Sequence, residues 1–113
     1  MEDNPKTVLG ATESVKIRSI NKSIRARIDT GAATCSIHHD IVEKYKLGPV
    51  VGKKKIRNAH GQAFRPVIKL PIKIAGRLLD VKFTVADRSE MKFNMLIGRN
   101  VLKKKFVVDV AKK

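Results

Sequence analysis

An Asp29-Thr30-Gly31 triplet at the end of an alternating strand is the segment best suited to chemistry. A carboxylate on a tight glycine turn can hold and polarise a water molecule, but one carboxyl group alone makes a poor peptide hydrolase. These residues suggest acid–base catalysis by two aspartates that share one proton. Because the triplet occurs once in the chain, the second aspartate must come from another copy. The sequence therefore predicts a homodimeric aspartic endopeptidase; the alternative is that Asp29 only caps a turn.

The chain is short and strongly basic. Its 113 residues predict one domain, residues 1–113, because a two-lobed monomer that carries both halves of such a site needs roughly twice this length. The 25 Lys and Arg against 10 Asp and Glu give a formal net charge of +15, which attracts nucleic acid or acidic polypeptides. The 4 % aromatic content argues against binding by base stacking. Three lysine runs, each best interpreted alone as a solvated face or tail, are Lys53–Lys55, Lys103–Lys105 and Lys112–Lys113.

Cysteine usage and the start of the chain indicate a location. Cys35 has no partner for an internal disulfide, and Met1 to Pro5 lack the basic and apolar pattern of a signal peptide. No apolar stretch approaches the roughly 18 residues that span a bilayer. We therefore expect a cytoplasmic protein that does not insert into a membrane.

Alternation with a period of two predicts two antiparallel hairpins. The first covers residues 15–28 and leaves Asp29 on its polar face, at the end of a strand. The second covers residues 68–85 and turns at residues 75–77. Pro71 cannot donate a hydrogen bond to a ladder, so its strand is expected to be an edge strand or to carry a bulge there.

A third hairpin is predicted between these two. Residues 53–58 and the segment from Ala63 onward flank His60-Gly61-Gln62, and the hairpin they form is expected to project. Such a hairpin can act as a mobile lid over a cleft.

Helix is sparse, so the predicted fold class is all-β, with one or two short helices. The first is expected at Asp40 to Tyr45, with Asp40 as its N-cap, and the second at Asn100 to Lys104, before a terminal strand at residues 106–108. Fraying is expected at residues 1–6 and 111–113.

Two motifs make a family resemblance specific. Asp29-Thr30-Gly31-Ala32 with the later Leu96-Ile97-Gly98-Arg99-Asn100 resembles the retropepsins, the small homodimeric aspartic proteases. More closely, the chain resembles the retropepsin-like family usually labelled ATP-dependent zinc proteases. The resemblance covers nearly all of Gly10 to Asp109. The further matching features are Gly10 and Glu13, Thr34 to His38, Arg65-Pro66-Val67, and the block from Asp87 to Arg99.

This resemblance implies a retropepsin-like closed barrel and gives roles to the matching residues. Asp29 would be the catalytic group, Gly31 would permit close backbone approach, and Thr30 would brace the paired loops through its hydroxyl. The residues expected to support the site are Ala32, Leu96, Ile97, Gly98 and Arg99.

The resemblance also implies a substrate. The family is tied to an ATP-grasp ligase that adds glutamates to the C-terminus of a small-subunit ribosomal protein, and the peptidase would trim that acidic tail. Arginine can bind each carboxylate bidentately, although a solvated surface charge is the alternative for each one. The expected partners are a second copy, an acidic peptide or protein tail, and a ribosomal protein or the ligase, with nucleic acid secondary. The substrate-binding candidates are Arg57, His60, Gly61, Arg65 and Arg88.

The residues do not support the zinc and ATP of the family's label. There is no H-E-x-x-H, and Cys35, His39 and His60 form a conceivable zinc site for which packed or solvated histidines are the better interpretation. Residues 48–54 lack the spacing and the Ser or Thr of a phosphate loop. We expect no metal and no cofactor. A nucleophilic dyad of Cys35 with His38 or His60 has no other support, so Cys35 is expected in the core or an interface.

A second function class stays open. The same barrel can serve as a noncatalytic module whose basic surface holds RNA or an acidic protein tail. Replacement of Asp29 by Asn separates the two classes, because only the hydrolase depends on that carboxyl group.

Overall fold

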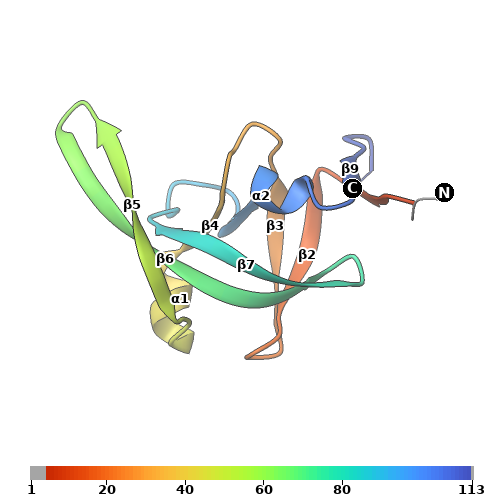
Figure 1. Ribbon diagram of the computed structural model, residues 1–113, viewed down its shortest axis with the longest axis horizontal. Coiled ribbons are helices and arrows are strands. Elements are labelled where there is room, and N and C mark those ends of the chain that lie inside the picture. The colour runs from red at the N-terminus through yellow and green to blue at the C-terminus, as the bar shows by residue number, and fades with distance from the viewer. Residues whose placement is uncertain (1–4, 113) are drawn as a thin grey trace.

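The structure is a computed structural model that describes residues 5–112 and consists mainly of β-strands (Figure 1). Two short helices accompany the strands in the described part of the chain. The elements are β1 (Thr7–Leu9), β2 (Thr12–Ile17), β3 (Lys22–Ile28), β4 (Cys35–His38), α1 (His39–Tyr45), β5 (Val50–Asn58), β6 (Gly61–Ile74), β7 (Arg77–Ala86), β8 (Met95–Ile97), α2 (Arg99–Leu102) and β9 (Phe106–Val108).

A closed barrel forms the centre of the molecule. Within the described residues, one sheet has the strand order β2-β3-β8-β4-β7-β6-β5, and β2 also pairs with β6. This additional pairing, which joins residues 15–17 to residues 72–74, closes the first six strands of that order into a ring. The remaining strand, β5, pairs only with β6 and stays outside the ring. The predicted all-β barrel with two short helices is confirmed.

The two hairpins predicted from alternation are present. Strands β2 and β3 pair with Val15 opposite Ile24, and β6 and β7 pair with Ile68 opposite Phe83. The apolar side chains of each alternation face the barrel interior, where Val15, Ile68 and Phe83 are fully buried. Burial of this apolar face is the main term that stabilises the barrel.

The expectation for Pro71 is wrong. Its strand β6 is not at the edge of the barrel, and its register against β7 runs without a shift past Pro71. The Lys69 N–H points away from β7 and donates to Pro49 O, and residues two apart in a strand point the same way. The nitrogen of Pro71 therefore faces the point where the other partner of β6 changes from β5 to β2, whose pairing begins at Ile72. The lost donor costs no ladder bond there.

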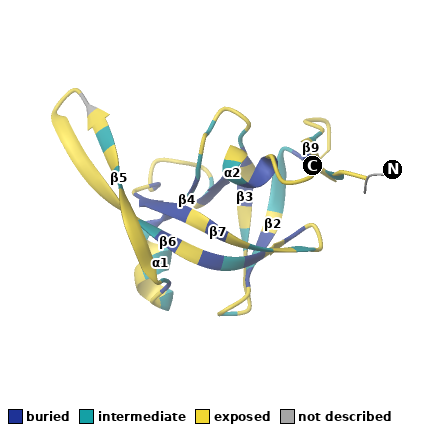
Figure 2. Cartoon of the chain, viewed as in Figure 1, coloured by how far each residue is buried: buried dark blue, intermediate teal, exposed yellow. Residues whose placement is uncertain are grey.

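The predicted projecting hairpin is confirmed. It comprises residues 50–66, from β5 and the first part of β6, and it extends beyond the barrel at the upper left of Figure 1. Residues 61–66 are all exposed, and none of residues 50–57 is buried (Figure 2). Gly61 has a φ of 117°, which favours glycine at the turn. Movement of this projecting hairpin as a lid stays a prediction.

Several short strands gave no alternation signal. Strand β8 pairs in parallel with β3 and antiparallel with β4, and β4 pairs in parallel with β7. All three residues of β8 are buried, so its sequence is a continuous apolar run without alternation. Strand β1 pairs in parallel with β9 in a separate two-stranded sheet near the chain ends.

The helices lie close to their predicted places, but Asp40 is not an N-cap. Helix α1 begins at His39, its N-cap position is His38, and no side chain caps it. The Asp40 carboxylate instead contacts the rings of both histidines. Helix α2 begins one residue before its predicted start and ends at Leu102.

The chain ends are partly tied to the barrel. The fraying expected at residues 1–4 and 113 lies outside the described residues. Lys112 Nζ donates to Val8 O at 2.9 Å, and Lys112 O accepts the Ala11 N–H at 2.9 Å. Among residues 5–112, no helix has the length and apolar character required to cross a membrane.

We expect Ile72→Ala to lower the free energy of unfolding by about 2–5 kcal/mol, because it leaves a cavity at a fully buried position. Leu78→Ala on the adjacent strand is the matched control, since Leu78 is 60 % exposed, and it should change stability by less than about 0.5 kcal/mol. Urea denaturation followed by circular dichroism measures both. Equal losses would contradict the inner and outer faces described above.

Candidate active site

Asp29 follows β3 directly and is held in place by β8. Its backbone N–H donates to Ile97 O at 2.9 Å, which continues the parallel pairing of the two strands. Its carboxylate Oδ1 accepts the Gly31 N–H at 2.8 Å. Asp29 is partly exposed, as its position on the polar face of the hairpin predicts. The carboxyl group is therefore oriented by the backbone and still accessible to a water molecule.

Gly31 allows this close contact. A Cβ atom at Gly31 would lie 3.2 Å from Asp29 Oδ1, which is tighter than ordinary packing. The Ala32 N–H donates to Asp29 O at 3.2 Å and closes the turn. The small residues after Asp29 thus let the backbone fold around its carboxylate.

Gly98 packs directly against the backbone of residues 32–34, which follow the Asp29 turn. A Cβ atom there would lie 2.6 Å from Thr34 O and 2.8 Å from Ala32 O, distances that side-chain carbons do not reach. The next two backbone N–H groups donate to the same loop: Arg99 N to Ala32 O at 2.8 Å, and Asn100 N to Ala33 O at 3.2 Å. The start of α2 is therefore docked by its backbone onto residues 32–34.

The Arg99 side chain also contacts the Asp29 loop. Its Nη1 donates to Thr30 O at 3.0 Å, and its backbone N–H donates to Ala32 O. Thr30 itself is exposed. Leu96 and Ile97, expected to support the site, are buried below it.

Cys35 and Asn100 connect the loop to the barrel. Asn100 Oδ1 accepts both the Cys35 N–H at 3.0 Å and the Cys35 thiol at 3.2 Å, and the Gly98 N–H donates to Cys35 Sγ at 3.3 Å. Burial raises the pKa of the Cys35 thiol to about 12, against smaller lowering effects of these hydrogen bonds. Cys35 is fully buried, as expected for a core residue. A protonated, buried thiol is poorly suited to nucleophilic attack or zinc binding.

Arg88 is a buried cation next to these elements. Only 7 % of its surface is exposed; its Nε donates to Phe93 O at 2.9 Å and its Nη1 to Ser36 Oγ at 3.0 Å. Burial lowers the pKa of the guanidinium, the charge of Arg27 lowers it further, and the charge of Asp29 opposes this shift. Arg88 therefore lies within electrostatic reach of Asp29, and part of its hydrogen-bonding capacity is already used inside the protein.

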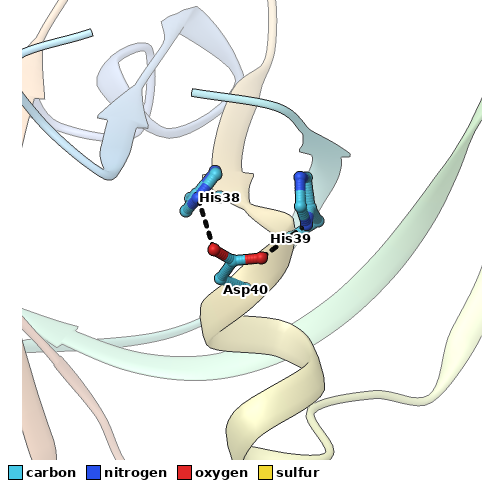
Figure 3. A group of neighbouring side chains, drawn as sticks. All are labelled: His38, His39 and Asp40. Carbon is cyan, nitrogen blue, oxygen red and sulfur yellow. Dashed lines mark ion pairs between the residues drawn. The ribbon is translucent and has the colours of Figure 1, made fainter. Parts of the chain in front are cut away.

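His38, His39 and Asp40 bring three atoms that can ligate a metal within 4.8 Å of one another (Figure 3). The Arg88 N–H donates to His38 Nδ1 at 2.9 Å, so the neutral ring carries its proton on Nε2, which faces Asp40 Oδ2 at 3.3 Å. A protonated ring nitrogen donates a hydrogen bond and does not bind a metal. The three side chains are therefore explained by the contacts of the two histidine rings with the Asp40 carboxylate. The group includes neither Cys35 nor His60.

The candidates on the projecting hairpin are exposed. Arg57, His60 and Gly61 lie towards its turn, and Arg65 lines a cavity of about 420 Å³ on the side of α1. A residue that sequence reasoning missed makes the connection: Lys54 Nζ donates to Thr34 Oγ1 at 3.1 Å. The alternation of side chains along the strand could have indicated this contact, because it places Lys54 on the same side as Ile56.

A second missed feature is a cavity of about 330 Å³ between the projecting hairpin and the loop. Its lining includes Thr34, Lys53, Lys54, Lys82 and Thr84. Cations and hydroxyl groups therefore meet beside the end of the Asp29 loop.

These features define a class of fold: a retropepsin-like barrel, in which an Asp-Thr-Gly turn at a strand end is docked onto a glycine of a closed barrel. A family model described as "RimB-like: Retropepsin-like aspartic endopeptidase RimB" matches residues 8–48 and 43–113. The chain belongs to this retropepsin-like family, as the sequence motifs predicted.

Solved structures share the fold. A protein of unknown function (DUF785), Lpg0085 from Legionella pneumophila, matches with a TM-score of 0.68 and 20 % identity, over 93 % of this chain and 94 % of that one. The simian foamy virus protease matches with a TM-score of 0.64 and 16 % identity, over 81 % and 91 % of the two chains. The EIAV protease, solved with the inhibitor HBY-793, matches with a TM-score of 0.63 and 23 % identity, over 91 % and 88 %.

Curated relatives are longer proteins. The chain is 26 % identical over 136 residues to a "Probable alpha-L-glutamate ligase" of Desulfotalea psychrophila, and 29 % identical over 135 residues to one of Shewanella pealeana. These alignments use 97 % and 96 % of this chain but 29 % of each relative. The chain thus corresponds to under a third of the length of these ligases.

We expect Gly98→Ala to lower the free energy of unfolding by at least about 1–3 kcal/mol, because the new methyl group meets two carbonyl oxygens that cannot move independently. Gly52→Ala is the control, since a Cβ atom there meets nothing within 4 Å. Thermal or urea unfolding measures both variants. A neutral Gly98→Ala would contradict the docking of α2 onto the loop.

The raised pKa of Cys35 predicts slow alkylation. At pH 8 the folded protein should hold far less thiolate than the unfolded chain, because burial raises the pKa of the thiol from its ordinary value of 9.0 to about 12. Iodoacetamide labelling with and without urea, followed by mass spectrometry, compares the two alkylation rates, and both the raised pKa and the burial of the thiol should slow labelling of the folded protein. Labelling of the folded protein at the rate of the unfolded chain would refute the buried position.

Proposed function

We propose that this chain is an aspartic endopeptidase that acts as a homodimer, with one Asp29 from each subunit. The observation that carries the proposal is the Asp29 turn: a partly exposed carboxylate, oriented by the Gly31 N–H and docked onto Gly98. The family match supports the same chemistry.

The chemistry follows from two carboxyl groups held close together. They cannot both ionise easily, so the pair shares one proton. The ionised Asp29 takes a proton from water, whose oxygen attacks the peptide carbonyl carbon, while the protonated Asp29 gives its proton to the carbonyl oxygen. The Asp29 that took the proton from water then gives it to the leaving nitrogen as the C–N bond breaks. Exposed Thr30 would hydrogen-bond across the dimer axis and hold the two loops in register.

The proposed substrate is an acidic peptide tail, such as a glutamate tail on a ribosomal protein. Lys53, Lys54 and Lys82 line the cavity beside Thr34 and suit carboxylate side chains. Arg57, His60, Gly61 and Arg65 would contact substrate when the projecting hairpin closes as a lid, and Arg88 would contribute its charge from below.

The relatives named as glutamate ligases support a link between this domain and glutamate addition. A ligase that adds glutamates and a peptidase that removes them would act on one tail in opposite directions. We therefore propose the ligase and a ribosomal protein as partners, and we expect the protein to meet them in the cytoplasm.

A noncatalytic role remains the second candidate. The net charge of +15 favours it, because a basic barrel can hold RNA or an acidic tail without cleaving either.

Asp29→Asn separates the candidates. We expect it to lower kcat/KM for a peptide with an oligoglutamate tail by at least about 10²–10⁴-fold, because the shared proton relay is lost. Glu90→Gln removes another exposed carboxylate from outside the site and is the control. Cleavage is followed by mass spectrometry of the peptide, with circular dichroism to check folding. Undiminished cleavage by Asp29→Asn would overturn the proposal, and absence of cleavage by the parent protein with intact peptide binding would favour the second candidate.

The homodimer makes a separate prediction. Specific activity should fall on dilution as subunits dissociate, because each subunit carries half of the site. Sedimentation analysis over the same concentrations should show monomer replacing dimer in parallel. Constant specific activity down to concentrations where only monomer sediments would refute the shared site.

A further inference from the structure

Three cavities join into one basic surface that leads away from the candidate active site. Lys82 lines both the cavity beside Thr34 and a second cavity of about 320 Å³, which lies between β7 and the end of α2. Lys103 and Lys104 line this second cavity and a third, of about 610 Å³, beside the start of β7. Because neighbouring cavities share residues, they form a continuous surface. Its lysine track is defined as Lys69, Lys82, Lys103, Lys104 and Lys105.

The lysine track is not neutralised within the chain. All five side chains are exposed, and no described acidic group lies within 4 Å of their ammonium groups. Asp80 is the acidic residue in the lining of the second cavity. The positive charge is therefore available to a ligand.

The sheet register places two of these charges directly opposite each other. Lys69 of β6 pairs with Lys82 of β7, and both are exposed on the outer face. Like charges in directly opposite positions destabilise a sheet. A bound anion between them would reduce this repulsion.

We propose that the lysine track is a second binding site, which holds the acidic stretch of a polypeptide as it leaves the catalytic cleft. Lys82 supports this direction, because it belongs both to the cavity beside the Asp29 loop and to the track. The inference rests on the proposed function in one respect: the cleft is taken as the place where the polypeptide is cut.

An acidic polypeptide fits the lysine track better than RNA does. Single-stranded nucleic acid is held by a basic groove together with aromatic rings on which bases stack. No aromatic side chain lines these three cavities. Lysines on flexible stems suit carboxylates that are distributed along an extended chain.

The test measures binding without catalysis. The full chain with Asp29→Asn is titrated against fluorescent oligoglutamate peptides of about four and about twelve residues, at low and at physiological salt. A triple variant replaces Lys69, Lys103 and Lys104 by Gln. We expect it to bind the long peptide about tenfold more weakly, as three exposed charge pairs are lost, and to bind the short peptide nearly as the parent does.

A matched control separates position from charge. Lys22, Lys44 and Lys46 are exposed lysines at or near Tyr45, away from the track, and their replacement by Gln removes the same three charges. This control should keep the long-peptide affinity within about twofold of the parent, and circular dichroism should show that both triple variants fold.

Three outcomes would overturn the inference: equal weakening by both triple variants, equal weakening for both peptide lengths, or a track variant that loses only affinity for a labelled single-stranded RNA of matched charge. None of them depends on cleavage. Failure of the proposed hydrolysis therefore leaves this measurement intact, and failure of the track leaves the Asp29 chemistry intact.

Discussion

The contact between Gly98 and the loop of residues 32–34 is the constraint on which the site depends. Two carbonyl oxygens occupy the space that a side chain at residue 98 would fill, and the following N–H groups bind the same loop. The backbone of one segment therefore rests directly on the backbone of the other. This leaves the Asp29 turn little freedom, so its carboxylate is held in one orientation. Because the carboxylate is already ordered, no binding free energy is needed to orient it.

The buried side chains around that contact are all neutral or satisfied. The Cys35 thiol both donates to and accepts from the segment that begins at Gly98, and Asn100 joins that segment to Lys82 O. No buried side-chain nitrogen or oxygen lacks a partner in the described part of the chain. Such a network stabilises one loop conformation because any alternative would strand a polar group in the core. The Asp29 carboxyl group, in contrast, is partly exposed to solvent.

The sequence was sufficient for the hairpins and for the Asp29 turn because alternation and glycine act locally. It was insufficient where long-range contacts decide. Strand β8 has three buried residues and no alternation, and Pro71 is accommodated by a change of partner strand that no local pattern reports. Asp40 was expected to cap α1, but two neighbouring histidines compete for its carboxylate. The contact of Lys54 with Thr34 depends on how the projecting hairpin leans, which side-chain spacing alone does not fix.

Buried and exposed cations occupy different parts of the molecule. One cation, Arg88, is buried and spends its donors on Ser36 and Phe93, so its charge reaches Asp29 with a fixed geometry. The lysines of the track are exposed. The Arg88 guanidinium is held in place by Ser36 and Phe93, whereas exposed lysines are screened by salt and act mainly on the approach and retention of a polyanion. The two groups therefore act differently: the fixed charge adds to the local field beside the Asp29 turn, and the exposed charges attract anions to the outer surface.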